Sequence, residues 1–298
     1  MSINEEQLKT WANAPSNTKS VFTHEEVRKA LEKSSALKER DYEIYLQGSY
    51  ANSTNIKIDS DVDIVVQLNE SFSFNASEFH KTQIEIFREL HPVPTYDLVY
   101  FRKDVIDALN AHFGVLAVKQ DVKCIKIPKD DRRVNADVVV CLEYHKYNTF
   151  DRVNINDYIT GMKFHTADGK EVFNYPKMHL KNGEDKNLSH RTGQKYKHIV
   201  RVIKNIRQKL IENGVIDQKI ACSYFIECAV YNVPDGHFNG TYKNSLEYAL
   251  DYILYRCTPA TMLTVSHQHN LFGNEPWQWN VTDANTFFVA VNNYYQNS

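Results

Sequence analysis

Acidic residues at the heads of two apolar runs constrain this chain more than any other feature. Asp61 and Asp63 open a run rich in Val and Ile over residues 61–68, and Asp137 stands at the head of a second such run over residues 136–144. Runs of β-branched residues favour strands. Alternate side chains of a strand point to the same face, so Asp61 and Asp63 share one. If the two strands are neighbours, Asp137 joins them and three carboxylates converge.

Three converging carboxylates repel one another unless a cation lies between them. Hard oxygen ligands suit Mg²⁺, with Mn²⁺ as an alternative, and two such ions suit in-line displacement at phosphorus. Gly48-Ser49 follows a predicted strand over residues 42–47, and eleven residues separate it from Asp61. Backbone N–H groups and a hydroxyl in such a turn can bind phosphate oxygens. A Gly-Ser turn or an Asp-x-Asp strand start alone is commonplace, but their combination predicts a nucleotide-transferring site.

The bulk composition excludes several classes of partner. Hydrophobic residues make up 42% of the 298 residues, so we expect a folded core. The net charge is −2, whereas proteins that bind nucleic acid usually carry a basic surface, so we expect no nucleic-acid activator. The polar, acidic start and the lack of a long apolar run predict neither a secretion signal nor a membrane partner. The five cysteines, odd in number and without CxxC spacing, are typical of reduced thiols, which predicts a cytoplasmic protein.

Hydrophobic periodicity predicts an α+β fold. A capping-box pattern at Thr23 and Glu26 indicates a helix to about residue 39, and helical patterns recur near residues 79–90 and 105–113. Strands are predicted over residues 42–47, 61–68, 122–127 and 136–144. Strand signals fade after residue 150, residues 151–195 are rich in loop formers, and helices are predicted at 196–210, 223–231, 246–256 and 284–295. We therefore expect a mixed sheet with flanking helices over residues 1–150, as the catalytic core, and a helical lobe over residues 151–298 that completes the nucleotide pocket.

The motif as a whole resembles the polymerase-β-like nucleotidyltransferases. The run over residues 45–56, followed by Asp59-Ser60 and the two acids, is similar to the bacterial cGAS/DncV-like nucleotidyltransferases of clade E, and so are residues 136–141, 174–177 and 223–228. The resemblance implies a nucleotidyltransferase core with a helical lobe, as in oligoadenylate synthetase and cyclic GMP-AMP synthase. It also implies a monomeric cyclic dinucleotide synthase that uses UTP and ATP. Its uridine-containing second messenger would switch on a separate effector protein in anti-phage signalling.

The resemblance assigns roles to individual residues. Asp61, Asp63 and Asp137 would be catalytic and hold two Mg²⁺ ions, and the nucleotide-binding residues would be Gln47, Gly48, Ser49, Asn174, Lys204, Ser223 and Tyr224. In the family, the lysine and the serines contact phosphates, the tyrosine stacks on a base, and the asparagine accompanies uridine selection.

The residues themselves leave other interpretations open. Lys204 lies off the apolar stripe of its helix and could be solvated, and Ser223 could cap a helix with Tyr224 in the core. Asn174 could form a turn, and its amide could pair with uracil or with adenine. The chain could also transfer nucleotides to another acceptor, such as an RNA end, a protein or a small molecule. It could equally be a non-catalytic nucleotide sensor, although a sensor would have no use for three mutually repelling acids.

Overall fold

The chain folds into two compact units that interleave along the sequence. The computed structural model describes residues 3–57, 61–275 and 277–297. Residues 17–47 and 60–176 form one unit, here called the sheet unit, and residues 1–16, 48–59 and 177–298 form the other, here called the helical unit. The division therefore does not follow a single boundary at residue 150. Strands after that residue hydrogen-bond to the sheet, and the N-terminal helix packs on a helix of the C-terminal half.

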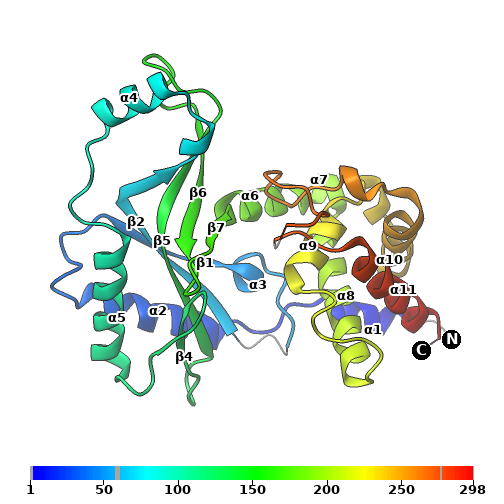
Figure 1. The fold of residues 1–298 in the computed structure, drawn as a ribbon. Coiled ribbons are helices and arrows are strands. Elements are labelled where there is room, and N and C mark those ends of the chain that lie inside the picture. The colour runs from blue at the N-terminus through cyan, green and yellow to red at the C-terminus, as the bar shows by residue number, and fades with distance from the viewer. Residues whose placement is uncertain (1–2, 58–60, 276, 298) are drawn as a thin grey trace. The chain divides into compact units, whose positions relative to one another are not determined.

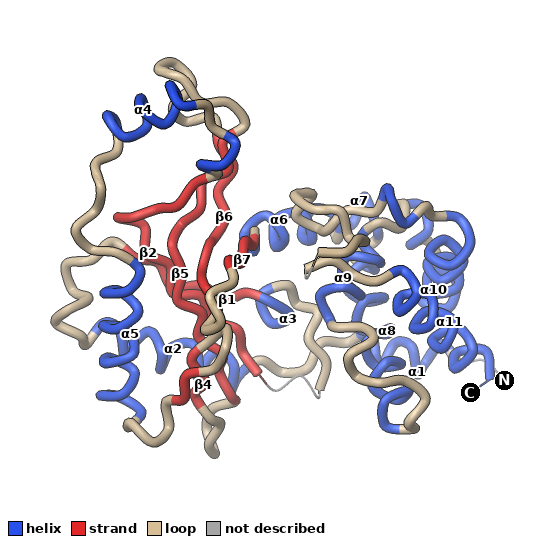
Figure 2. Tube along the Cα trace, in the orientation of Figure 1, coloured by secondary structure: helices blue, strands red, loops and turns tan. Residues whose placement is uncertain are grey.

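The sheet unit is built on one mixed sheet, shown in red in Figure 2. Among the described residues the sheet has seven strands: β1 (Tyr42–Gln47), β2 (Asp61–Phe74), β3 (Lys119–Gln120), β4 (Ile125–Ile127), β5 (Asn135–Tyr147), β6 (Tyr158–His165) and β7 (Glu171–Asn174). The order is β1-β2-β5-β4-β3, with β6 paired to β5 and β7 paired to β6. β2 and β5 are parallel and the other pairs are antiparallel. This parallel pair places the two acidic strand starts at the same end of the sheet.

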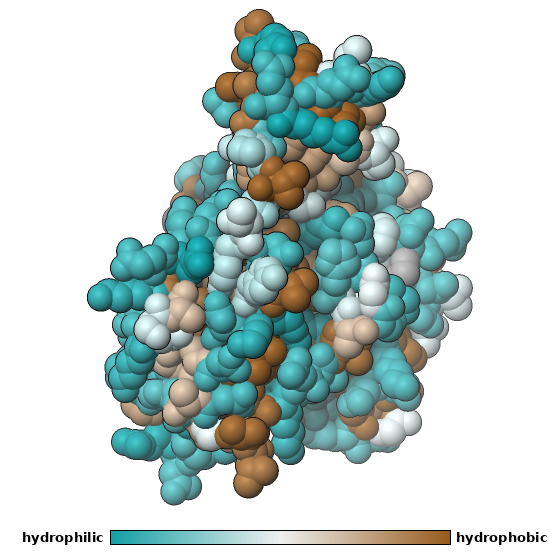
Figure 3. Space-filling model, turned by 60° about the vertical axis from the view of Figure 1, so that its left-hand side comes forward, coloured by the Kyte–Doolittle hydropathy of each residue, from teal (hydrophilic) through white to brown (hydrophobic). Residues whose placement is uncertain are grey.

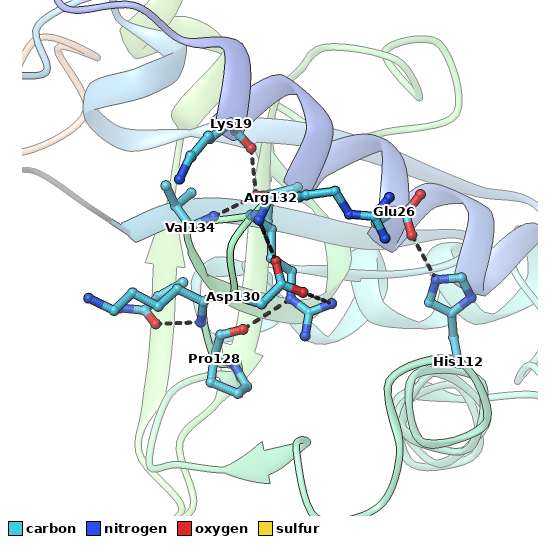
Figure 4. Close-up of polar contacts among 11 residues, drawn as sticks. Lys19, Glu26, His112, Pro128, Asp130, Arg132 and Val134 are labelled. Atoms are coloured by element: carbon cyan, nitrogen blue, oxygen red, sulfur yellow. Dashed lines mark hydrogen bonds and ion pairs between the residues drawn. The ribbon is translucent and has the colours of Figure 1, made fainter.

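Among the described residues, the α-helices of the sheet unit are α2 (Thr18–Glu32), α4 (Lys81–Leu90) and α5 (Leu98–Phe113). α2 and α5 pack on each other and on the sheet (Figure 1). The predicted capping box was wrong, because α2 begins five residues before Thr23. The Thr23 hydroxyl donates to the Lys19 carbonyl at 2.7 Å and accepts from the Val134 N–H at 3.1 Å. Glu26 instead contacts His112 of α5 at 3.2 Å, as Figure 4 shows.

The helical unit gathers around α8. Its helices are α1 (Glu5–Ala12), α3 (Gly48–Ala51), α6 (Pro176–Lys186), α7 (Ser189–Thr192), α8 (Lys195–Glu212), α9 (Ser223–Tyr231), α10 (Tyr242–Asp251) and α11 (Val281–Asn297). Ile199, Ile203 and Ile206 of α8 are fully buried, which confirms the predicted apolar stripe. α1, α9, α10 and α11 pack against this helix. The predicted helices at 196–210 and 223–231 are confirmed nearly to the residue.

β6 and β7 were missed by the sequence patterns, which indicated loops there. Gly161 is the reason for part of the error, because a glycine usually weakens a strand. Here it permits a close approach: a Cβ at this position would lie 2.8 Å from the Asn174 carbonyl oxygen and 2.9 Å from the Tyr175 ring. The predicted strand over 122–127 is shorter than expected, since only Ile125–Ile127 pairs with β5.

The described helices include none that is both long and apolar enough to cross a bilayer. Hydrophilic residues cover most of the face drawn in Figure 3, and the hydrophobic residues on it gather in small patches.

Candidate active site

The acidic residues at the starts of β2 and β5 lie next to one another in the sheet. In the parallel register of β2 and β5, Asp61 pairs with Asn135 and Asp63 pairs with Asp137. Paired residues on adjacent strands point to the same face of a sheet, and alternation brings Asp61 to that face too. Val62, which alternates with the acids, is fully buried. The expectation that the two acidic strands are adjacent is therefore confirmed.

Asn135 orients the carboxylate of Asp61. Its side-chain amide donates to Asp61 Oδ1 at 2.9 Å and accepts from the Lys129 N–H at 2.8 Å. The turn that supplies this N–H is closed by Asp130, whose carboxylate accepts from the Arg133 N–H at 2.9 Å (Figure 4). The sequence patterns gave Asn135 no role, although its position two residues before Asp137 in a strand puts it on the acidic face.

Asp137 lies in a partly buried, charged neighbourhood. Burial raises the pKa of Asp137, and the charge of Asp61 raises it further. The nearby Lys126 and a hydrogen bond with the Cys124 thiol act in the opposite direction, but the net shift is upward. Lys126 is the β4 partner of Asp137 and is also paired with Asp121 at 2.7 Å. An Asp137 carboxyl that resists ionisation is one that a nearby cation would stabilise as the anion.

The residues fit a hard divalent cation in their chemistry. Asp61, Asp63 and Asp137 offer carboxylate oxygens alone, the donors that Mg²⁺ prefers. The raised pKa of Asp137 reflects its burial first and then the charge of Asp61. Within the described ranges, however, no three His, Cys, Asp or Glu side chains are drawn together as a ready-made ion site. The register of β2 and β5 nevertheless brings the three acids to one face of the sheet.

The Gly48-Ser49 turn follows β1 directly. Gln47, the last residue of β1, pairs with Asp63 across the β1–β2 ladder. Gly48 has φ +68°, the left-handed region that glycine adopts without strain. In the helical unit the Asn52 N–H donates to the Gly48 carbonyl at 3.0 Å, and the Thr54 N–H donates to the Ser49 carbonyl at 2.9 Å. The predicted turn is therefore present; Asp59 and Ser60 of the motif lie outside the described residues.

Helix α9 presents Ser223 and Tyr224 at its first turn. The N-cap is Cys222 rather than Ser223, and Tyr224 is 39% exposed, so the interpretation of a capping serine beside a buried tyrosine was wrong. Hydrogen bonds with Cys228 and Thr264 hold the Tyr224 side chain, and its ring centroid lies 5.5 Å from that of His179. A fixed aromatic ring with an exposed surface is suited to stacking on a base.

Lys204 is not a solvated surface residue, and Asn174 does not lie in a free turn, the two alternatives that the sequence left open. Lys204 is only 2% exposed, which excludes the solvated-surface interpretation, and its Nζ donates to the Thr54 carbonyl at 2.9 Å. Asn174 is the exposed last residue of β7, paired with Met162, rather than part of a free turn. Both therefore lie at ordered positions in their respective units.

Two family models match complementary parts of the chain. Residues 25–159 match the nucleotidyltransferase domain, and residues 181–296 match the C-terminal helical domain of cGAS/DncV-like nucleotidyltransferases. The chain is 39% identical over 288 residues to a cyclic UMP-AMP synthase of Rhodothermus marinus, covering 96% of each protein.

Solved structures agree with these matches. A Rhodothermus marinus CdnE c-UMP-AMP synthase with Apcpp and Upnpp superposes with a TM-score of 0.90 at 37% identity, covering 99% of this chain and 97% of that one. An Elizabethkingia meningoseptica CdnE cyclic dinucleotide synthase with GTP and Apcpp gives a TM-score of 0.77 at 29% identity, covering 98% of both chains. These relatives carry different pairs of nucleotides, so the bases differ among chains of one fold.

Proposed function

Because the chain belongs to the cGAS/DncV-like nucleotidyltransferases, with relatives of the CdnE type, we propose that it joins two nucleoside triphosphates into a cyclic dinucleotide and releases pyrophosphate. The observation that carries this proposal is the register of β2 and β5, which pairs Asp63 with Asp137 on the face shared with Asp61. A catalytically silent relative would gain nothing from that concentration of negative charge.

The three acids would hold two Mg²⁺ ions, which when bound would neutralise the charge that develops on the phosphates. In our proposal Asp137 accepts the proton of the attacking ribose hydroxyl, a role that suits its raised pKa. The hydroxyl attacks the α-phosphorus in line, and pyrophosphate leaves. A second transfer of the same kind closes the ring.

The triphosphate is bound, in this proposal, by backbone N–H groups of the Gly48-Ser49 turn and by the hydroxyls of Ser49 and Ser223, with Gln47 leading into the turn. Lys204 contributes positive charge and supports the loop through Thr54. Tyr224 stacks on a base, for which the exposure of its ring is the support.

We propose UTP and ATP as substrates and a uridine-containing product. The support is the printed activity of the Rhodothermus relative, a cyclic UMP-AMP synthase, together with the exposed position of Asn174 at the end of β7. The Asn174 amide can present one donor and one acceptor to the edge of uracil. The proposal extends to a monomeric, cytoplasmic enzyme without a nucleic-acid activator, whose product switches on a separate effector protein in anti-phage signalling.

The test is incubation of the purified protein with all four nucleoside triphosphates and Mg²⁺, followed by mass spectrometry of the phosphatase-resistant product. We expect a cyclic dinucleotide that contains uridine, and none from the Asp61→Asn/Asp63→Asn double variant. The Asn174→Ala variant should lower the uridine share of the product. If nucleotides from radiolabelled triphosphates were transferred only to an added RNA, protein or small molecule, the chain would instead act on that acceptor. Binding of triphosphates without pyrophosphate release would favour a sensor.

A further inference from the structure

A buried carboxylate fastens the loop that follows the Gly-Ser turn. Glu227, in the second turn of α9, is 2% exposed. It accepts hydrogen bonds from Asn52 Nδ2 at 3.0 Å, from Thr54 Oγ1 at 2.5 Å and from His179 Nε2 at 3.1 Å. All four residues belong to the helical unit, and the proposed mechanism gives no role to Glu227, Asn52 or His179.

Basic side chains of α8 hold the backbone of the same loop. Lys204 Nζ donates to the Thr54 carbonyl at 2.9 Å, and the Arg201 guanidinium donates to the Ser53 carbonyl. Arg201 also donates to the Ala12 carbonyl of α1. Residues 52–54 are therefore held through the side chains of Asn52 and Thr54 and through the backbone carbonyls of Ser53 and Thr54.

The surroundings keep Glu227 ionised in the interior. Burial alone would raise the pKa of Glu227, but the hydrogen bond and charge of His179, the charge of Lys204 and the hydrogen bond from Thr54 together lower it. Hydrogen bonds to a buried carboxylate are among the stronger ones in proteins. A neutral side chain of the same shape would lose much of that strength.

The loop residues that Glu227 holds also close the Gly-Ser turn. The Asn52 N–H donates to the Gly48 carbonyl, and the Thr54 N–H donates to the Ser49 carbonyl. Glu227 lies one helical turn after Ser223 and Tyr224, and α3 packs against α9. One side chain thus connects the Ser49 turn to the first turn of α9.

From these contacts we infer that Glu227 is a positioning residue for the nucleoside triphosphate: it fixes the Ser49 turn against the helix that carries Ser223 and Tyr224. The inference rests on the proposed function of those residues. A carboxylate that merely stabilised the core would change the melting temperature without changing nucleotide affinity, and this difference separates the two roles.

The test compares Glu227→Gln with Asp235→Asn. Asp235, whose side chain is 33% exposed, also makes ion-paired contacts in the helical unit, with Lys186 at 2.8 Å and Arg191 at 2.7 Å. We expect Glu227→Gln to raise the KM for the triphosphates, and their Kd in a calorimetric titration, by about tenfold or more, since charge-assisted bonds are lost. Asp235→Asn should lower the melting temperature and leave KM and Kd unchanged.

Two further variants keep the inference open to refutation. Glu227→Gln combined with Asn52→Asp exchanges donor and acceptor across this contact, so it should recover part of the lost affinity. Thr54→Val, which removes one hydroxyl, should also raise Kd and serves if Glu227→Gln does not fold. Unchanged KM and Kd in Glu227→Gln, or in Thr54→Val if that is the folded variant, would overturn the inference while the wild type still forms product. A wild type without product would instead overturn the proposed function.

Discussion

Asp63 and Asp137, which are 74 residues apart in the chain, are direct partners in the parallel ladder of β2 and β5. Main-chain hydrogen bonding sets their spacing, so the two carboxylates stay neighbours whatever their charge. The arrangement carries an electrostatic cost in the absence of a cation, and this cost has measurable consequences.

Removing the Asp137 charge should cost activity and not stability. The pKa of Asp137 is raised in the fold, so the folded state holds this proton more tightly than the unfolded state and the ionised form opposes folding at neutral pH. Asp137→Asn should therefore melt at the same temperature as the wild type or higher at pH 7, while product formation falls by about 10²–10⁴-fold. Calorimetry and a pyrophosphate-release assay measure the two effects. A variant that melts much lower would show that Asp137 supports the fold.

The left-handed conformation of Gly48 should matter for nucleotide affinity. Gly48→Ala forces an L side chain into φ +68°, at a cost of about 1–2 kcal/mol of stability, and it should raise the KM for triphosphates because the turn shifts. Gly214→Ala is the matched control, since Gly214 has φ +67° just after the end of α8 with open space around it. The control should lose similar stability and keep its KM. If the Gly48→Ala variant had the same KM for triphosphates as the control variant, the Gly48-Ser49 turn would not bind the phosphates.

The ring of Tyr224, rather than its hydroxyl, should determine base stacking. Tyr224→Ala should weaken triphosphate binding by about 1–3 kcal/mol, the usual contribution of one stacked base. Tyr224→Phe keeps the ring and loses only the hydrogen bonds with Cys228 and Thr264, so its affinity should stay near that of the wild type. Titration calorimetry with each triphosphate distinguishes the two. Equal loss in both variants would point to the hydroxyl instead.

His198 should make the fold sensitive to acid. Burial, followed by the charges of Arg201 and Lys195, lowers the pKa of His198 to about 4, and its Nδ1 contacts the Tyr242 hydroxyl at 2.9 Å. The folded state therefore keeps His198 neutral while the unfolded state takes up a proton below about pH 6.5. Its contribution to stability is complete above that pH and is lost as the pH falls towards 4.

The comparison is between melting curves of His198→Asn and of the wild type. The Asn side chain can still accept a hydrogen bond from Tyr242, so the substitution should cost little stability at neutral pH. Because Asn does not titrate, the variant should lose less stability than the wild type between pH 6.5 and 4. His190→Asn, at an exposed histidine of α7, should keep the wild-type pH dependence. If the pH dependence of His198→Asn matched that of the wild type, His198 would not be the group that titrates.

The sequence patterns predicted those strands and helices whose formation depends mainly on residues adjacent in the sequence. The period of two at Asp61 and Asp63 and the period of α8 needed only the adjacent sequence, and both are confirmed. The β6 strand was missed because its Gly161 is favoured by a contact with Asn174, which no local pattern reveals.

Nonlocal contacts also decided which unit each segment joins. The turn segment over residues 48–57 belongs to the helical unit, and its hydrogen bond from Asn52 to Glu227 spans 175 residues of sequence. Such a partnership has no signature in spacing or composition, so it could only be seen in three dimensions. The same holds for Thr23, whose hydroxyl binds Val134 instead of capping a helix.

The most direct test of the account is a Mn²⁺ titration followed by electron paramagnetic resonance, with a non-hydrolysable triphosphate present. The wild type should bind Mn²⁺ at the acids of β2 and β5, and the Asp63→Asn/Asp137→Asn variant should lose that binding while it remains folded. Equal Mn²⁺ binding by the two proteins would contradict the claim that these paired carboxylates hold the metal.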